Sequence, residues 1–223
     1  MHSRFEIYTP IHKGLRRSLS LLAINAGKLD HNDENALNAL YNAISEQARL
    51  VDVHHTLEER FTHPMLDARV PGGAELLEEE RRTLKHRLDN LTNFAARLRA
   101  ASDNEERQDL GLECYLALNR FISLFWSHLD REEEQAQPTL WRFYSDEELV
   151  TMWNQLLAAQ STADTKANLE LIFAASNLSD IVDAFRHVDV KALPQDHPNA
   201  LKVAEQTFNA NEWGALKSRL REL

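Results

Sequence analysis

Two pairs of a histidine and a glutamate, each four residues apart, are the residues of this sequence best placed to do chemistry. His54 and Glu58 form one pair, and His128 and Glu132 form the other. On an α-helix this spacing puts both side chains on one face, about one turn apart. Imidazole and carboxylate together suit iron or manganese better than a sulphur-loving metal. The two pairs therefore indicate a metal site.

The apolar residues around each pair predict that the pair lies on the buried face of its helix. A buried polar residue costs free energy unless a partner satisfies it. Glu58 falls near the middle of an apolar stripe, with His54 and His55 flanking it on opposite sides, so periodicity alone does not choose between these two histidines. The stripe that leads into His128 and Glu132 consists of Leu110, Cys114, Ala117, Phe121 and Phe125.

Helical periodicity predicts four long helices in the first part of the chain. We expect Thr9 to cap the first helix and Pro10 to occupy its first position. His63-Pro64 is expected to end the second helix and Pro138 to follow the end of the fourth. Long helices with short joins are typical of an up-down-up-down four-helix bundle in an all-α protein. The expected ranges are 9–26, 34–62, 74–100 and 104–135.

In such a bundle the predicted ligands meet at one end. His12 lies on the inward face near the start of the first helix, beside the ends of the second and fourth. The third helix would add His86 or Glu80. Glu80 falls on the apolar stripe, whereas His86 falls roughly 150° from its centre, so a π-bulge or a helix rotation would be needed to turn His86 inward. Four histidines and two bridging carboxylates suit two ions rather than one.

Each of these residues has a plainer interpretation when it is taken alone. A single buried histidine is usually a hydrogen-bonded core residue, and HxxxE on an exposed helix is usually an ordinary side-chain pair. Under these plainer interpretations, five such residues would have reached the inward faces at one end of one bundle by chance. We therefore interpret them as metal ligands. We assign solvated, outer or structural roles to Glu59, His63, Glu133 and Glu134.

After Pro138 the character of the chain changes. Aromatic residues occupy 140–144, and Ser145-Asp146-Glu147-Glu148 is typical of a capping box that opens a helix to about residue 159. None of the later segments carries a cluster of metal-type ligands. We therefore predict a metal-binding bundle over 1–140 and a C-terminal extension over 141–223 that packs on it. The further helices are expected at 165–175, 179–188, 199–208 and 211–223.

The composition disfavours several classes of function. The 223 residues carry a formal net charge of −10 and no basic tract, which disfavours binding to nucleic acid or to an anionic membrane. Cys114 is the single cysteine, so no internal disulfide can form, and we interpret it as a small buried apolar residue. No apolar run approaches the ~20 residues of a membrane span, and no signal peptide is recognisable. We expect a cytoplasmic protein.

This arrangement resembles the hemerythrin-like family, the HHE cation-binding domains. That family's pattern is a histidine in the first helix, an HxxxEE unit followed by proline, a histidine in the third helix, and a second HxxxEE unit followed by proline. The resemblance covers about residues 8–140 and implies a non-haem di-iron centre with carboxylate and oxo or hydroxo bridges. The matching residues are His12, His54 through Glu59 with Pro64, His86, and His128 through Glu133 with Pro138.

The resemblance also implies a role for each residue. His12, His54, His86 and His128 would be terminal ligands, and Glu58 and Glu132 would be bridges. It thus favours His54 over His55 and His86 over Glu80. Arg82 stands where the oxygen-carrying hemerythrins have a second histidine in the third helix, and arginine cannot ligate, so stoichiometric O2 carriage is not expected.

The implied function is the binding, sensing or handling of O2, NO, peroxide or iron, with a small diatomic or peroxide ligand at the metals. Two other classes stay open. One is a di-iron oxidase or peroxidase-like enzyme, although the sequence carries no substrate-binding signature. The other is a metal-stabilised interaction module that uses residues 141–223. Manganese or zinc are alternatives to iron, because both accept histidine and carboxylate ligands.

Overall fold

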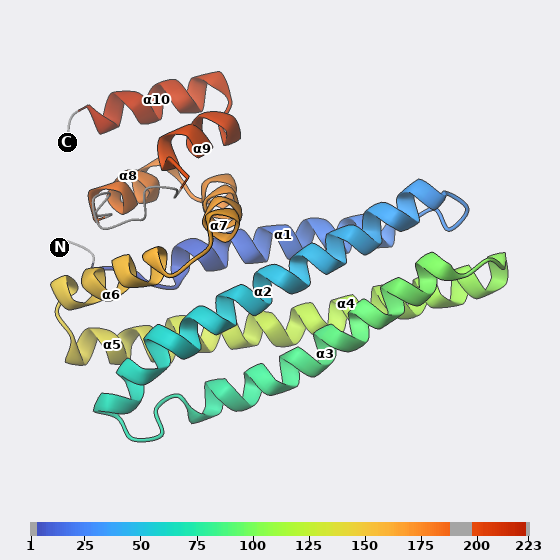
Figure 1. Ribbon diagram of the computed structural model, residues 1–223, viewed down its shortest axis with the longest axis horizontal. Helices are drawn as coiled ribbons and strands as arrows, with labels where there is room; N and C mark the ends of the chain where they lie inside the picture. The colour runs from blue at the N-terminus through green and yellow to red at the C-terminus, as the bar shows by residue number, and fades with distance from the viewer. Residues whose placement is uncertain (1–3, 188–197, 222–223) are drawn as a thin grey trace.

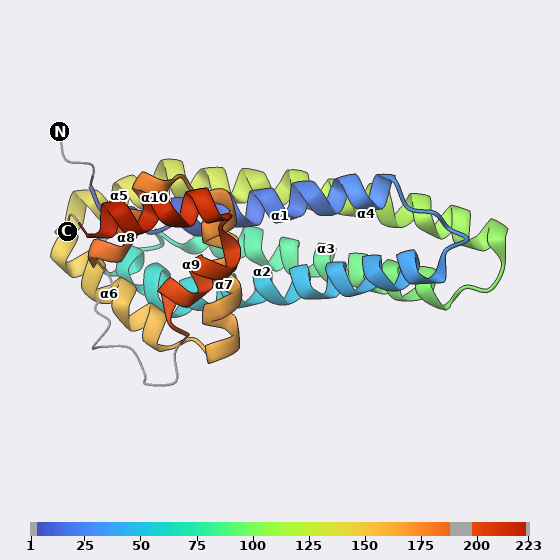
Figure 2. The same cartoon turned by 90° about the horizontal axis from the view of Figure 1, so that it is seen from above.

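The computed structural model describes residues 4–187 and 198–221, and this part of the chain is all-helical. The four longest helices lie side by side along the long axis of the molecule (Figure 1 and Figure 2), with α1 and α3 each packed against both α2 and α4. They are α1 (Thr9–Gly27), α2 (Glu34–Arg69), α3 (Glu75–Ala100) and α4 (Asn104–Arg131). We call these four helices the bundle.

The start of α1 differs from the prediction by one residue. Tyr8, not Thr9, is the N-cap, and Thr9 is the first helical residue. The hydroxyl of Thr9 donates a hydrogen bond to the Glu6 carboxylate at 2.6 Å instead of capping the helix. Pro10 lies in the first turn, where its missing N–H costs little.

The predicted ends of the second and fourth helices were wrong, because α2 continues past its proline and α4 ends at Arg131, before a π-helical turn. The α2 helix runs through Pro64 to Arg69, and this continuation buries Leu66 to 2 % exposure. Burial of a leucine contributes about 1.5–3 kcal/mol, which offsets much of the cost of an interior proline. After α4 a π-helical turn (Glu132–Ala136) leads into α5 (Gln137–Phe143), whose first turn contains Pro138.

Two apolar cores lie on either side of the predicted ligands. Along α1, Tyr8 belongs to one core and Leu15 to the other, with His12 between them. The larger core fills the bundle and includes Cys114, whose predicted burial is confirmed. The smaller core lies near the start of α1 and joins α2, α3, α5 and α6. A polar cluster between two apolar cores is shielded from bulk water at both ends.

The later helices form the C-terminal extension. They are α6 (Asp146–Ala158), α7 (Thr162–Ala175), α8 (Leu178–His187), α9 (Ala200–Thr207) and α10 (Ala210–Leu220). The predicted capping box at Ser145 is confirmed by its two hydrogen bonds with Glu148. Helices α7 to α10 share a small apolar core of their own. The predicted positions 188, 222 and 223 lie outside the described residues, and α5 crosses the predicted boundary at residue 140.

The extension packs closely on the bundle where α7 crosses α1 (Figure 1). A Cβ atom added to Gly14 of α1 would lie 2.8 Å from the Cβ of Leu171 in α7. Glycine therefore lets the two helices approach more closely than any other residue would. No helix among the described residues is long and apolar enough to cross a bilayer.

Candidate metal centre

Six buried side chains from α1, α2, the end of α4 and the π-helical turn that follows it converge between the two apolar cores. They form two groups, and within each group the donor atoms all lie within 4.8 Å of one another. Glu58 belongs to both groups. The first group is His12, His54, Glu58 and Glu132, and the second is His55, Glu58 and His128. The spacing of these residues on their helices thus gives two adjoining sets of donors rather than one.

Glu132 joins the two sides of this cluster. One of its carboxylate oxygens lies 3.3 Å from Nε2 of His12, and the other lies 3.1 Å from Nε2 of His128. In α2, Nε2 of His54 lies 3.1 Å from a carboxylate oxygen of Glu58. A carboxylate whose two oxygens face different histidines has the arrangement that a bridging ligand needs.

A π-helical turn begins at Glu132, directly after the α-helical turn that carries His128. The backbone N–H of Gln137 donates to the carbonyl of Glu132, which is the wider spacing of a π-helix. The extra residue rotates the chain that follows, so that Ala136 and Leu140 face the smaller core. Such turns are frequent at functional sites. The π-bulge that would turn His86 inward does not form in the third helix, because α3 is α-helical over its whole length.

The structure does not bring His86 to the cluster. His86 is exposed on α3, and its ring nitrogen Nδ1 lies 3.3 Å from the side-chain amide of Asn90. The physical reason is helical phase, since the buried face of α3 is formed by Leu77, Leu84, Leu88 and Leu91. Without a bulge in α3, His86 stays on the opposite face, as its position relative to the apolar stripe predicted.

Glu80, the alternative to His86, approaches the cluster from outside. One of its carboxylate oxygens lies 3.0 Å from Nδ1 of His128, and the other accepts a hydrogen bond from Arg131 at 2.8 Å. Contact with Nδ1 leaves Nε2 of His128 facing Glu132. The third helix therefore contributes a partner that orients a candidate ligand.

Both His54 and His55 belong to the cluster, although the sequence argument treated them as alternatives. Both are buried, and the ring centroid of His55 lies 5.4 Å from that of His128. Residues three and four positions before Glu58 both reach its face of the helix. The sequence HHxxE thus carried the signal for two donor side chains from one helical turn.

Glu133 orients His12 as Glu80 orients His128. Its carboxylate lies 2.8 Å from Nδ1 of His12 and also accepts hydrogen bonds from Arg16 at 2.6 and 3.1 Å. Burial alone would raise the pKa of Glu133, but the contacts with His12 and Arg16 lower it to about 2. The ionised carboxylate can only accept, so Nδ1 of His12 donates, and Nε2 of the neutral ring would offer its lone pair to a metal ion in the cluster.

The electrostatics of the cluster also suit a cation. Burial, followed by repulsion from Glu132, raises the pKa of Glu58 well above its usual range. Attraction to His128, together with the close approach of His12, outweighs burial and holds the pKa of Glu132 low. Burial lowers the pKa of His54 strongly and that of His55 to about 3, so both rings are neutral, which is the form that binds metals.

Several donor atoms of the cluster lack a hydrogen-bond partner among the described residues. They are Nε2 of His12, His54 and His55 and both carboxylate oxygens of Glu58 and Glu132. Buried polar atoms in proteins are almost always satisfied, and seven such atoms at one place would be costly. A bound cation would satisfy them together, so these residues fit a metal.

Sequence reasoning missed one residue beside the cluster, Tyr8. Tyr8 is 2 % exposed and its ring centroid lies 5.5 Å from that of His12; burial, followed by repulsion from Glu132 and Glu58, raises its pKa, so the phenol stays protonated. Tyr8 precedes His12 by one helical turn, which was the available signal. His63, predicted to be structural, is buried with Nδ1 3.8 Å from Glu78 and lies outside both donor groups.

Comparison with known families gives one match. The sequence model described as the hemerythrin HHE cation binding domain matches residues 4–140. This range covers more than half of the chain and contains every member of the cluster. Searches of curated proteins and of solved structures give no significant match.

Proposed function

Because the chain belongs to the family of hemerythrin HHE cation-binding domains, we propose that it is a non-haem di-iron protein that binds, senses or handles O2, NO, peroxide or iron. We further propose that α1 to α4 form the up-down-up-down bundle of that family and that the protein works in the cytoplasm. The bundle topology is supported by the joins between the four helices, which lie alternately at its two ends in Figure 1.

The observation that carries the proposal is the overlap of two donor groups at Glu58. A single ion would use one group and leave buried donors of the other unsatisfied, whereas two ions would use both. Glu132 supports the same conclusion, since its two oxygens face His12 and His128 separately. The proposed ligands are His12, His54, His55, Glu58, His128 and Glu132.

Two bound iron ions would supply redox chemistry and coordination positions for a small ligand. The chain's own residues supply the rest. The ring of Phe125 is fully buried, and its centroid lies 5.8 Å from the ring centroid of His55 and 6.4 Å from that of His128. Phe125 therefore excludes water from that side of the cluster. Tyr8 holds its proton beside Glu58 and Glu132, where the hydroxyl is available as a hydrogen-bond donor.

The test is a metal analysis of protein purified from iron-replete cells and then reconstituted anaerobically. We expect about two iron ions per chain and, after oxidation, the charge-transfer absorption of a bridged ferric pair. The variant Glu132→Gln should lose iron, and Glu134→Gln, on the exposed neighbouring side chain, should not. Less than one iron per chain without that absorption would overturn the proposal, as would stoichiometric zinc in its place.

A second candidate is a di-iron oxidase or peroxidase-like enzyme. It is favoured by one observation, a cavity that reaches His54 and Glu58 from the side of the C-terminal extension. Turnover of peroxide by the iron-loaded protein would support an enzyme if Glu58→Ala abolished it. Turnover no faster than that of free iron would exclude this candidate.

A further inference from the structure

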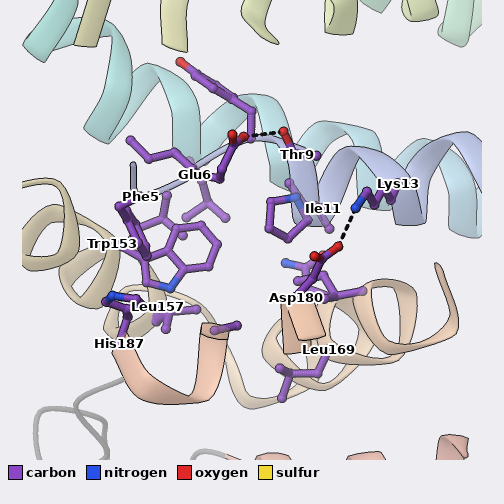
Figure 3. A pocket seen from close by; sticks show the side chains of 18 of the residues that line it. Phe5, Glu6, Thr9, Ile11, Lys13, Trp153, Leu157, Leu169, Asp180 and His187 are labelled. Carbon is purple, nitrogen blue, oxygen red and sulfur yellow. Dashed lines mark hydrogen bonds and ion pairs between the residues drawn. The ribbon is translucent and has the colours of Figure 1, made fainter. Parts of the chain in front are cut away.

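A cavity of about 740 Å³ lies between the bundle and the C-terminal extension. Its inner side is formed by the segment before α1, the start of α1, and α2, and its outer side by α6, α7 and α8 (Figure 3). Its volume falls within the range of about 300–1,000 Å³ typical of small-molecule sites. His54, Glu58 and Thr62 are part of the wall, so the cavity adjoins the first donor group.

Apolar side chains dominate the middle of the cavity. Phe5 and Trp153 stand together on one side of it in Figure 3, with ring centroids 6.1 Å apart and planes inclined by 71°. Leu157 of α6, Leu169 of α7 and Ile11 of α1 continue this surface. A molecule that fills this space would exchange water for aromatic and aliphatic contacts.

The basic side chains around the cavity are already paired. An anionic ligand would have to displace a carboxylate from one of them, because no lysine or arginine among the described lining residues faces the cavity without an acidic partner. The pairs and their N–O distances are Arg4 with Asp146 at 2.7 Å, Lys13 with Asp180 at 2.5 Å, and Arg186 with Asp183 at 2.7 Å.

The inner end of the cavity disfavours a cationic ligand. His54 and Glu58 would hold metal cations there, and like charges at short range repel strongly in a buried site. This step rests on the proposed function. The paired basic side chains disfavour an anion, and the metal site at the inner end disfavours a cation. An uncharged ligand therefore fits the cavity best.

The extension supplies about half of this wall, and its close docking keeps the cavity narrow. Gly14 allows α7 to approach α1, and the Lys13–Asp180 ion pair connects α1 to α8 across the outer side (Figure 3). Without α6 to α8, the face of α2 that carries His54 and Glu58 would meet solvent at this position. The extension thus has a physical role beside the metal centre.

We propose that the C-terminal extension and the bundle together form a binding chamber for an uncharged, mainly apolar organic molecule, placed directly beside the metal centre. The chamber is separate from the donor atoms themselves. Its ligand contacts Trp153, Leu157 and Leu169 and approaches the metal centre from the side of His54.

The test uses the full chain, with and without iron, and the uncharged fluorophore 1-aminoanthracene as the probe. We expect saturable binding of about one probe per chain, with energy transfer from tryptophan. Trp153→Phe should reduce this transfer more than Trp213→Phe, because Trp153 lines the cavity and Trp213 in α10 does not. The anion anthracene-1-carboxylate should bind about tenfold more weakly or worse.

Filling the cavity should prevent binding. Ala184 of α8 is half-buried and lines the cavity, so Ala184→Phe should weaken probe binding about tenfold or more, while Ala174→Phe on the exposed face of α7 should not. Leu157→Trp fills the same space from α6 and replaces Ala184→Phe if that variant misfolds by circular dichroism. Absent or non-saturable binding to the wild type, or equal binding to a folded cavity-filling variant, would overturn the proposal.

The outcomes for the chamber and for the di-iron centre can be told apart. Probe binding without iron uptake would support the chamber and overturn the di-iron proposal. Iron uptake without probe binding would support the di-iron proposal and overturn the chamber. Equal binding of the anionic and uncharged probes would overturn the assignment of an uncharged ligand.

Discussion

Glu133 lies 2.8 Å from Nδ1 of His12, and this contact decides which ring nitrogen of His12 faces the cluster of donor side chains. The neighbouring residue, Glu132, faces Nε2 of the same ring at 3.3 Å. Two consecutive glutamates therefore hold one histidine from its two sides. The inner carboxylate is fully buried, and the outer one is also bound to Arg16.

Removing the charge of the outer carboxylate should weaken iron binding without removing a ligand. We expect Glu133→Gln to lower the affinity for iron about 10- to 100-fold, the usual effect of losing a partner that orients a metal-bound histidine. Competition with a ferrous chelator would measure it. Glu134→Gln is the matched control, because Glu134 is the next residue and is exposed. Equal affinities in the two variants would show that the contact with His12 does not influence the metal.

His55 and His86 should respond differently to substitution. His55 belongs to the second donor group and is buried, whereas His86 is exposed on the far face of α3. We expect His55→Ala to reduce the iron content from about two ions per chain to about one, and His86→Ala to leave it unchanged. Elemental analysis of both reconstituted variants measures this. Loss of iron in His86→Ala alone would restore the ligand set that the family pattern implied.

The local geometry of helices made much of the cluster predictable. Residues four apart on one helix must share a face, so His54 with Glu58 and His128 with Glu132 could be paired from the sequence, and the structure brings both pairs and His12 together. For His86 the helical phase predicted a position away from the buried face of the third helix, whereas the family resemblance implied a metal ligand. The structure follows the phase, because nothing interrupts the hydrogen bonding of α3.

Features that depend on distant contacts were not predictable. Pro64 carries a strong local signal for a helix end, but the burial of Leu66 against residues near the N-terminus keeps α2 helical. Tyr8 precedes His12 by one helical turn, but it lies before the predicted start of the first helix, so its burial beside the cluster was not expected. The cavity is formed by α1, α2 and α6 to α8, and no sequence pattern links these elements.

Gly14 should be needed for the docking of α7 on α1. In Gly14→Ala the new Cβ would lie 2.8 Å from backbone and Cβ atoms of Leu171, so the helices must move apart. Gly214→Ala in α10 is the control, because its Cβ meets nothing within 4 Å. Both changes gain up to about 1 kcal/mol of helix propensity, but we expect Gly14→Ala to be less stable than Gly214→Ala by about 1–3 kcal/mol. Urea unfolding measures the difference, and equal stabilities would mean that α7 adjusts freely.

Cys114 should make the protein less stable in alkali. The thiol is fully buried in the core of the bundle, and burial raises its pKa from 9.0 to about 11. Between these two values the unfolded chain ionises its thiol and the folded chain largely does not, so the free energy of unfolding should fall by about 2 kcal/mol as the pH rises from 9 to 11. Urea unfolding at several pH values measures this fall, and Cys114→Ala should lack this part of it.

The same burial should leave the native thiol of Cys114 almost unreactive with iodoacetamide at pH 8, with rapid alkylation only after unfolding. Rapid alkylation of the folded protein would mean that the core opens around α4 on the timescale of the reaction, and the thiol would then report that opening rather than global unfolding.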